Sequence, residues 1–83
     1  MLNLPTTFSL EILRRNVVDM AGELLGTLAD FSLDIKTGNV VAILVVVQPD
    51  IDPTVLPWNT VEGLLSIPIE EVDNVGTNVQ LKR

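Results

Sequence analysis

The stretch that decides the fold spans residues 23–47, ELLGTLADFSLDIKTGNVVAILVVV, and it predicts two long strands joined by one tight turn. In the first strand, Ala29, Phe31 and Leu33 alternate with polar residues, which is the two-residue period of a strand with one buried face. The turn between the strands contains Asp34, whose carboxylate can accept turn amides, and Gly38, which tolerates the positive φ that a reversal needs. The stretch therefore predicts a β-hairpin.

The second strand, Val40–Val47, is apolar throughout and rich in β-branched residues, so a strand is favoured over a helix. Both of its faces need cover. The chain has no room for the crossover helices that cover parallel sheets, and we expect one face to line the interior of a small barrel. Two alternatives remain open for the other face. Either residues 1–8 and the loop after Gln48 fold over it, or it forms an oligomer interface.

The apolar residues of this strand and of the following loop supply the predicted interface. Its candidate members are Val41, Ile43, Val45, Val47, Leu56 and Trp58. Trp58 is the only tryptophan of the chain, and two interpretations of it remain open. It is either a lid on the core or an anchor of the interface, because large aromatic side chains serve both purposes.

The composition limits what the chain can do. Its 83 residues make one domain, which at this size buries only about 60% of the surface of the unfolded chain. An apolar fraction of 47% exceeds what one small core can hide and therefore favours association. The net charge of −6 argues against binding nucleic acid through phosphates and against docking on an anionic membrane.

We expect no catalytic site, no cofactor and no metal. The chain lacks cysteine and histidine, which excludes disulfides and metal sites built on those residues. Glu70 and Glu71 are adjacent and therefore point apart, whereas an acid/base pair must converge on a substrate. Asp50 and Asp52 superficially resemble the start of a calcium loop, but Pro53 interrupts the spacing and the glycine of such a loop is absent.

The sequence predicts a cytoplasmic protein. The longest apolar run, Val40–Val47, is far shorter than the roughly 20 residues of a membrane-spanning helix. The start of the chain lacks a basic segment followed by an apolar stretch, so no signal peptide is predicted.

Before the hairpin, residues 1–7 form a predicted leader, residues 8–13 a strand and residues 19–23 a turn. Arg14 and Arg15 are either solvated or a recognition patch for an acidic partner. Gly26 lies inside a predicted strand, which indicates a bulge or a close approach of another backbone.

After the hairpin, residues 48–60 carry three prolines and predict a long irregular loop. Residues 63–69 predict a strand that Pro68 stops, because proline removes a ladder donor. Residues 69–76 predict one helical turn that ends in a reversal, and residues 77–81 predict a last short strand.

A series of short motifs runs through residues 10–81 and carries a family resemblance. Its members are Val18-Asp19, Gly22, Leu25-Gly26, Asp30, Asp34, Thr37-Gly38-Asn39-Val40, Ile67-Pro68, Val72, Val75-Gly76 and Val79. In this order and spacing the series resembles the PRC-barrel domain, which is named after the cytoplasmic part of the photosynthetic reaction centre H subunit and also ends the ribosome maturation factor RimM. The resemblance assigns residues 8–83 to this domain. It implies an all-β fold, a small, largely antiparallel barrel with one short helical turn near Glu70, which binds other proteins and has no shared catalytic site.

A free-standing barrel of this length is similar to archaeal PRC-barrel proteins. Some of these resemble cell-division adaptors that bind SepF, the membrane anchor of FtsZ, and that pair with themselves or with a sister barrel. The resemblance thus implies a non-enzymatic adaptor that forms a homodimer or polymer and reaches the division site through a membrane-anchored partner. The alternative is a ribosome-assembly module similar to the barrel of RimM. The proline-rich loop at residues 48–60 departs from the common pattern, so no partner-binding residues are transferred from the family.

Overall fold

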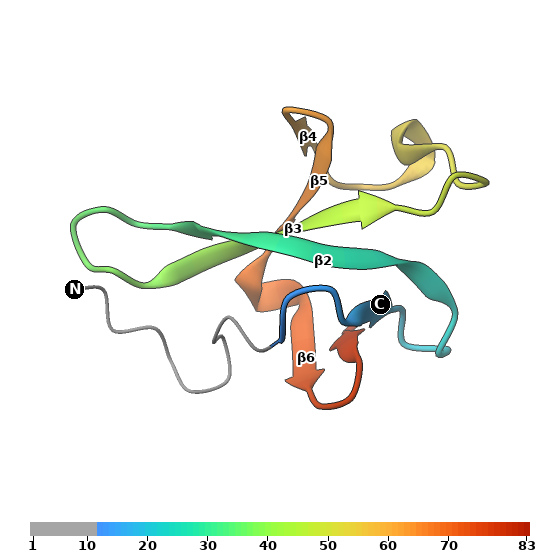
Figure 1. Cartoon of the computed structure of the whole chain (residues 1–83), viewed down its shortest axis with the longest axis horizontal. Helices are drawn as coiled ribbons and strands as arrows, with labels where there is room; N and C mark the ends of the chain where they lie inside the picture. Colours follow the sequence, from blue (N-terminus) through green and yellow to red (C-terminus); the bar gives the residue numbers. More distant parts are fainter. Residues whose placement is uncertain (1–11) are drawn as a thin grey trace.

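One curved sheet runs through the computed structural model of the chain, which describes residues 12–83 (Figure 1). The strands are β1 (Asn16–Val18), β2 (Leu24–Leu33), β3 (Val40–Val47), β4 (Thr60–Val61), β5 (Leu64–Pro68), β6 (Val72–Val75) and β7 (Val79–Leu81). Two short 3-10 helices, η3 (Pro53–Val55) and η4 (Ile69–Glu71), lie between strands.

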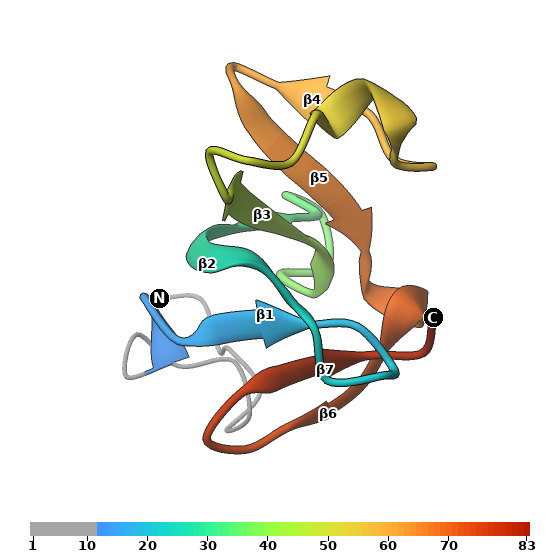
Figure 2. The same ribbon diagram turned by 90° about the vertical axis from the view of Figure 1, so that its right-hand side faces the viewer.

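The strand order in the sheet is β4-β5-β3-β2-β1-β7-β6. All neighbouring pairs are antiparallel except β1 and β7, which run parallel. Figure 2 shows β4 and β5 on one side of the long β2–β3 hairpin and β1, β7 and β6 on the other. The prediction of an all-β, largely antiparallel fold with a short helical turn near Glu70 is confirmed.

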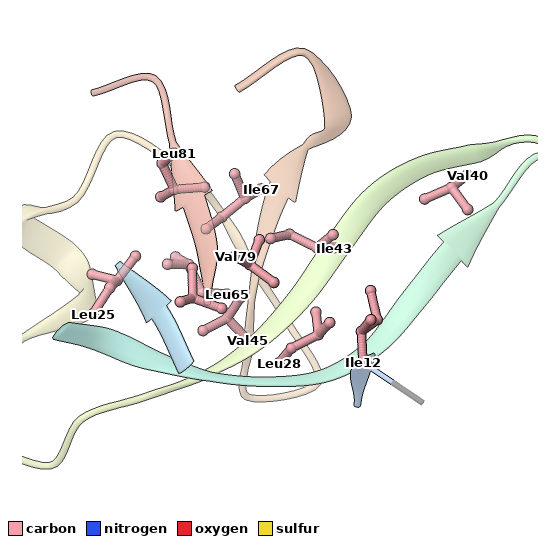
Figure 3. Close-up of a cluster of buried hydrophobic side chains, with 11 residues drawn as sticks. Ile12, Leu25, Leu28, Val40, Ile43, Val45, Leu65, Ile67, Val79 and Leu81 are labelled. Atoms are coloured by element: carbon pink, nitrogen blue, oxygen red, sulfur yellow. The ribbon is translucent and has the colours of Figure 1, made fainter. Parts of the chain in front are cut away.

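Side chains close the barrel where the sheet itself is open. Strands β5 and β7 are not neighbours in the sheet, yet their buried residues meet in one apolar cluster (Figure 3). The cluster consists of Ile12, Val17, Leu25, Leu28, Val40, Ile43, Val45, Leu65, Ile67, Val79 and Leu81. Within residues 12–83 no polar or charged residue is buried, so the interior is held together by apolar contact alone.

The predicted hairpin is present, with the local chemistry that its turn indicated. Asp34 Oδ1 accepts a hydrogen bond from the Lys36 amide at 2.9 Å. The Gly38 amide donates to the Asp34 carbonyl at 2.7 Å, and Gly38 has a φ of 73°. The carboxylate orders the turn, and the glycine supplies the left-handed residue that returns the chain into β3.

A bulge in β2 changes which residues face inward. The register passes from Leu28↔Val45 to Asp30↔Leu44, so Ala29 is the extra residue. Leu28 is fully buried, and Phe31 packs against the core beyond the bulge. The prediction that Ala29 shares the inward face of Phe31 and Leu33 is therefore wrong, because the bulge takes Ala29 out of the alternation.

Gly26 lies where two strands approach closely, as predicted. A Cβ atom at this position would lie 2.1 Å from the Val46 carbonyl oxygen on β3. On its other side, β2 pairs with β1, and the register there passes from Val17↔Gly26 to Val18↔Leu24. Leu25 is therefore the bulge residue in the pairing with β1, and it lies next to Gly26, where β3 approaches closely.

The turn predicted at residues 19–23 is also confirmed. Asp19 Oδ1 accepts hydrogen bonds from the amides of Ala21 and Glu23, both at 2.9 Å. Gly22 adopts a φ of 84°, and its amide donates to the Asp19 carbonyl at 3.0 Å. As in the hairpin, an aspartate acceptor and a left-handed glycine make the reversal.

A strand was predicted at residues 8–13, and its two described residues, Ile12 and Leu13, do not form one. The leader at residues 1–7 and the first four residues of this strand lie outside the described residues. Ile12 and Leu13 form a helical turn, in which the Arg15 amide donates to the Ile12 carbonyl at 3.1 Å. Arg14 has a φ of 73°, so the chain reverses here before it enters β1.

Beyond the hairpin, β5 and η4 agree with the predicted strand and helical turn, and β7 forms within the predicted last strand. The predicted turn at residues 69–76 is too long, since Val72–Val75 forms β6 against β7. The predicted irregular loop also contains η3 and the first residue of β4. Glu62 and Gly63, with φ values of 52° and 82°, make the tight turn from β4 to β5.

Candidate protein-binding surfaces

Two of the six predicted interface residues lie in the core. Ile43 and Val45 have no exposed surface, and both point into the apolar cluster of the barrel (Figure 3). The sequence could not place them, because a strand that is apolar at every position does not reveal which alternate residues face inward. The assignment of Ile43 and Val45 to an accessible surface is therefore corrected.

Val47 and Val41, the other two predicted interface residues of β3, are less buried than Ile43 and Val45. Val47 is half-buried and packs against the core. Val41 is the extra residue where the register passes from Ser32↔Ala42 to Leu33↔Val40, and 42% of it is exposed. The bulge at Val41 breaks the alternation that would otherwise have turned this residue inward with Ile43.

The outward face of β3 carries two further apolar residues that the sequence did not single out. Leu44 is half-buried, and Val46 is 51% exposed. We use the name outward β3 face for Val41, Leu44 and Val46, the exposed or half-buried residues of β3 that do not pack against the core cluster. Val46 lies opposite the polar Thr27 and Leu44 opposite Asp30, a signal that can be read only once the pairing of β2 and β3 is known.

Leu56 and Trp58 cover the interior of the barrel from the loop after β3. Both are half-buried and pack against the core cluster, as does Ile51 of the same loop. This packing agrees with the lid interpretation of Trp58. Three residues of the loop thus pack on the core, and Val41 and Val46 remain exposed.

A hollow of about 220 Å³ lies beside this lid. It is lined by Asp19, Leu25, Leu56, Pro57, Trp58, Leu81 and Arg83. The Arg83 guanidinium lies 5.6 Å from the centre of the Trp58 ring, within the range of a cation–π contact, and it also forms an ion pair with Glu71. Arg83 therefore links the lid to η4.

A family model for the PRC-barrel domain matches residues 8–82. The chain belongs to the PRC-barrel domain family. No curated protein matches it.

The two adjacent arginines of this PRC barrel have different surroundings. Arg15 Nη1 donates to the Gly76 carbonyl at 2.6 Å, which ties the start of β1 to the turn between β6 and β7. Arg14 is exposed. The pair is therefore not a uniform basic patch, because one member is engaged in holding two turns of the barrel together.

Two carboxylates of the barrel, those of Asp52 and Glu71, contribute to local structure. Asp52 Oδ1 accepts from Thr54 Oγ1 at 2.7 Å and from the Thr54 amide at 2.9 Å, which caps η3. The hydrogen bonds from the Thr54 hydroxyl and amide lower the pKa of Asp52. The cap therefore contributes stability at pH values above the ordinary carboxyl pKa. This contribution is lost as the pH falls through the lowered pKa of Asp52. Glu71 pairs with Arg83, whereas Glu70 is exposed.

Within residues 12–83 no three acidic, histidine or cysteine side chains come together as a metal site requires. In the same range no helix has the length and apolar character needed to cross a bilayer.

Trp58 offers a test of the lid. Its Nε1 atom is buried and has no hydrogen-bond acceptor among the described residues. Trp58→Phe keeps most of the apolar contact and removes this donor, so we expect a loss of stability below about 1 kcal/mol. Trp58→Ala removes the lid and should cost about 3 kcal/mol. Urea unfolding followed by circular dichroism measures both variants. Equal losses in the two variants would contradict the lid, because a phenyl ring in the same place would then preserve no more stability than alanine does.

Proposed function

We propose that this PRC barrel is a non-enzymatic adaptor that binds a partner protein and associates with a second copy of itself or a sister barrel. The observation that carries the proposal is the outward β3 face. Apolar residues there lie on a central strand of the sheet, and Val41 and Val46 are 42% and 51% exposed. Apolar side chains exposed in this way lose contact with water when a partner covers them, and that burial favours association.

The non-enzymatic part of the proposal is supported by the chemistry of the described residues. The carboxylates of Asp19, Asp34 and Asp52 accept hydrogen bonds from turn amides, and that of Glu71 pairs with Arg83. The carboxylate of Asp30 accepts from the neighbouring Phe31 amide within β2. The interior within residues 12–83 contains no buried polar or charged residue, so it offers no desolvated acid or base. The family supports the same view, because a PRC barrel is a small interaction module.

The finer proposal is a role in archaeal cell division. We propose that the adaptor binds SepF in the cytoplasm and reaches the division site through that membrane-anchored partner. The support is the resemblance to free-standing archaeal PRC-barrel proteins. The net charge of −6 favours a protein partner over nucleic acid or an anionic membrane. No cofactor is needed for this role.

The test is light scattering after size exclusion, over a concentration series. The barrel is measured alone and then mixed with SepF of the same source organism. We expect a dimer or polymer alone and a heavier complex on mixing. The variant Val41→Lys should weaken at least one of these associations by about tenfold, because it places a charge in an apolar contact.

The matched control is Ile35→Lys, which adds the same charge at a residue that is 95% exposed in the hairpin turn. It should leave both associations unchanged. A strict monomer that ignores SepF at every concentration would overturn the proposal. Co-sedimentation with ribosomal subunits would then test the alternative role in ribosome assembly.

A further inference from the structure

One end of the barrel combines exposed apolar residues with carboxylates. It is formed by the turn from β1 to β2 and by the chain that leaves β3, and the Gln48 amide joins the two by donating to the Leu25 carbonyl at 3.0 Å. Met20, Leu24 and Val46 are 66%, 39% and 51% exposed in these segments. The hollow lined by Asp19, Leu25 and Leu56 also brings the turn next to the loop.

The same segments carry four acidic residues and no basic one, and the basic residue that lines the hollow beside them, Arg83, is paired with Glu71. The four are Asp19, Glu23, Asp50 and Asp52. We call these four, with Met20, Leu24 and Val46, the acidic end. Among the described residues the ion pair is between Arg83 and Glu71, so none of the four carboxylates is neutralised in that way. The opposite end of the hairpin carries Lys36.

We propose that the acidic end binds a basic amphipathic segment of the partner protein. This inference rests on the proposed adaptor function and names the chemistry of the partner. The apolar side chains of such a segment would cover Leu24 and Val46, while its lysines and arginines would face the carboxylates of the turn before β2 and of the loop after β3. Complementary charge steers the encounter and fixes orientation, and apolar burial slows dissociation.

Charge also decides between this occupant and a second copy of the chain. Two copies that met through this end about a two-fold axis would place the same carboxylates opposite each other. Like charges so placed oppose association. This repulsion favours a partner of opposite charge over a second copy at the acidic end, and self-association would instead use the part of the outward β3 face around Val41.

The probe for the test is a fluorescein-labelled synthetic peptide of alternating lysine and leucine, measured by fluorescence anisotropy on the full chain. The variant Glu23→Lys/Asp50→Lys should weaken its binding by about tenfold at low salt, where exposed charges are least screened. These two positions are chosen because Asp19 and Asp52 also order their own turns.

The control Glu70→Lys/Asp73→Lys changes the net charge by the same amount at exposed residues of η4 and β6. It should change peptide affinity less than twofold. Equal weakening by both pairs would overturn the proposal, since it would show attraction to the net charge alone. Circular dichroism spectra like that of the original chain establish that each variant is folded.

A second pair of variants tests the apolar part. Leu24→Thr/Val46→Thr should weaken peptide binding by about tenfold at physiological salt, where screening leaves apolar burial as the larger contribution. Val61→Thr, at a residue of β4 that is 50% exposed, should have no effect. Unchanged binding by the Leu24→Thr/Val46→Thr variant would also overturn the proposal.

The two proposals fail in different ways. If the peptide does not bind the original chain while the complex with SepF still forms, the acidic end is not the docking surface and the adaptor function stands. If the peptide binds through the acidic end while neither self-association nor a complex forms, the adaptor function fails and the recognition of basic segments stands.

Discussion

Replacing Gly26 by alanine is expected to destabilise the barrel by about 3 kcal/mol or more, at the upper end of what overpacking costs. The new Cβ would lie 2.1 Å from the Val46 carbonyl oxygen and 2.9 Å from Val45 Cγ1. The nearest atom belongs to the backbone of β3, which cannot rotate away as a flexible side chain would. Relief of the clash requires β2 and β3 to separate where Gly26 pairs with Val47.

This loss is large against a total stability of about 5–15 kcal/mol for a domain. Urea unfolding followed by circular dichroism should show a lower midpoint or no folded baseline. The matched control is Gly76→Ala, because a Cβ at Gly76 meets nothing within 4 Å and its φ lies outside the left-handed range. A stability for Gly26→Ala equal to that of Gly76→Ala would show that the two strands are farther apart than described.

The variant Ile43→Ala is expected to lose about 2–5 kcal/mol of unfolding free energy, the usual range for a large aliphatic residue cut back inside a core. Ile43 is fully buried on β3, between its register partners Phe31 on β2 and Ile67 on β5. Removing its outer carbons leaves a cavity that the surrounding strands can fill only in part.

Val46→Ala is the control on the same strand. Val46 is 51% exposed and should lose less than about 1 kcal/mol. Urea unfolding of both variants, at the same protein concentration, gives the two losses of stability. The larger loss identifies the inward face of β3. If Ile43→Ala kept its stability and lost only self-association, Ile43 would be an interface residue and its placement in the core would be wrong.

The hairpin could be predicted from sequence because its determinants are local. Asp34 and Gly38 order the turn through residues only a few positions away, and Asp19 and Gly22 do the same before β2. Gly26 was recognisable for a related reason, because a glycine inside an apolar strand favours close approach of another backbone. Such features need no knowledge of which strands pair.

The face of β3 could not be predicted, since it depends on pairing. Val40–Val47 is apolar at every position, and only the bulges at Ala29 and Val41 decide which residues point inward. A shift of one residue exchanges the two faces of a strand. The sequence pattern therefore does not separate Ile43 and Val45, which are buried, from Leu44 and Val46, which are not.

The strand β6 illustrates a second limit. Val72-Asp73-Asn74-Val75 followed by Gly76 has the composition of a turn, and Asp and Asn are disfavoured in strands. Pairing with β7 overrides that preference through the register Val72↔Leu81 and Val75↔Val79. Trp58 was predictable as a lid or an anchor, but its contact with Arg83 joins residues that only the fold brings together.

The parallel pair of β1 and β7 has a consequence for how the chain acquires its fold. Val17 lies opposite Val79, so β1 pairs with the strand that follows all the other strands of the barrel along the sequence. The interior also draws on both, because Val17, Val79 and Leu81 belong to one cluster. Until β7 is in place, the apolar hairpin lacks part of its cover, and contacts between residues so distant in sequence form slowly. Before β1 and β7 pair, the unpaired strands and exposed apolar residues of the partly folded barrel favour aggregation.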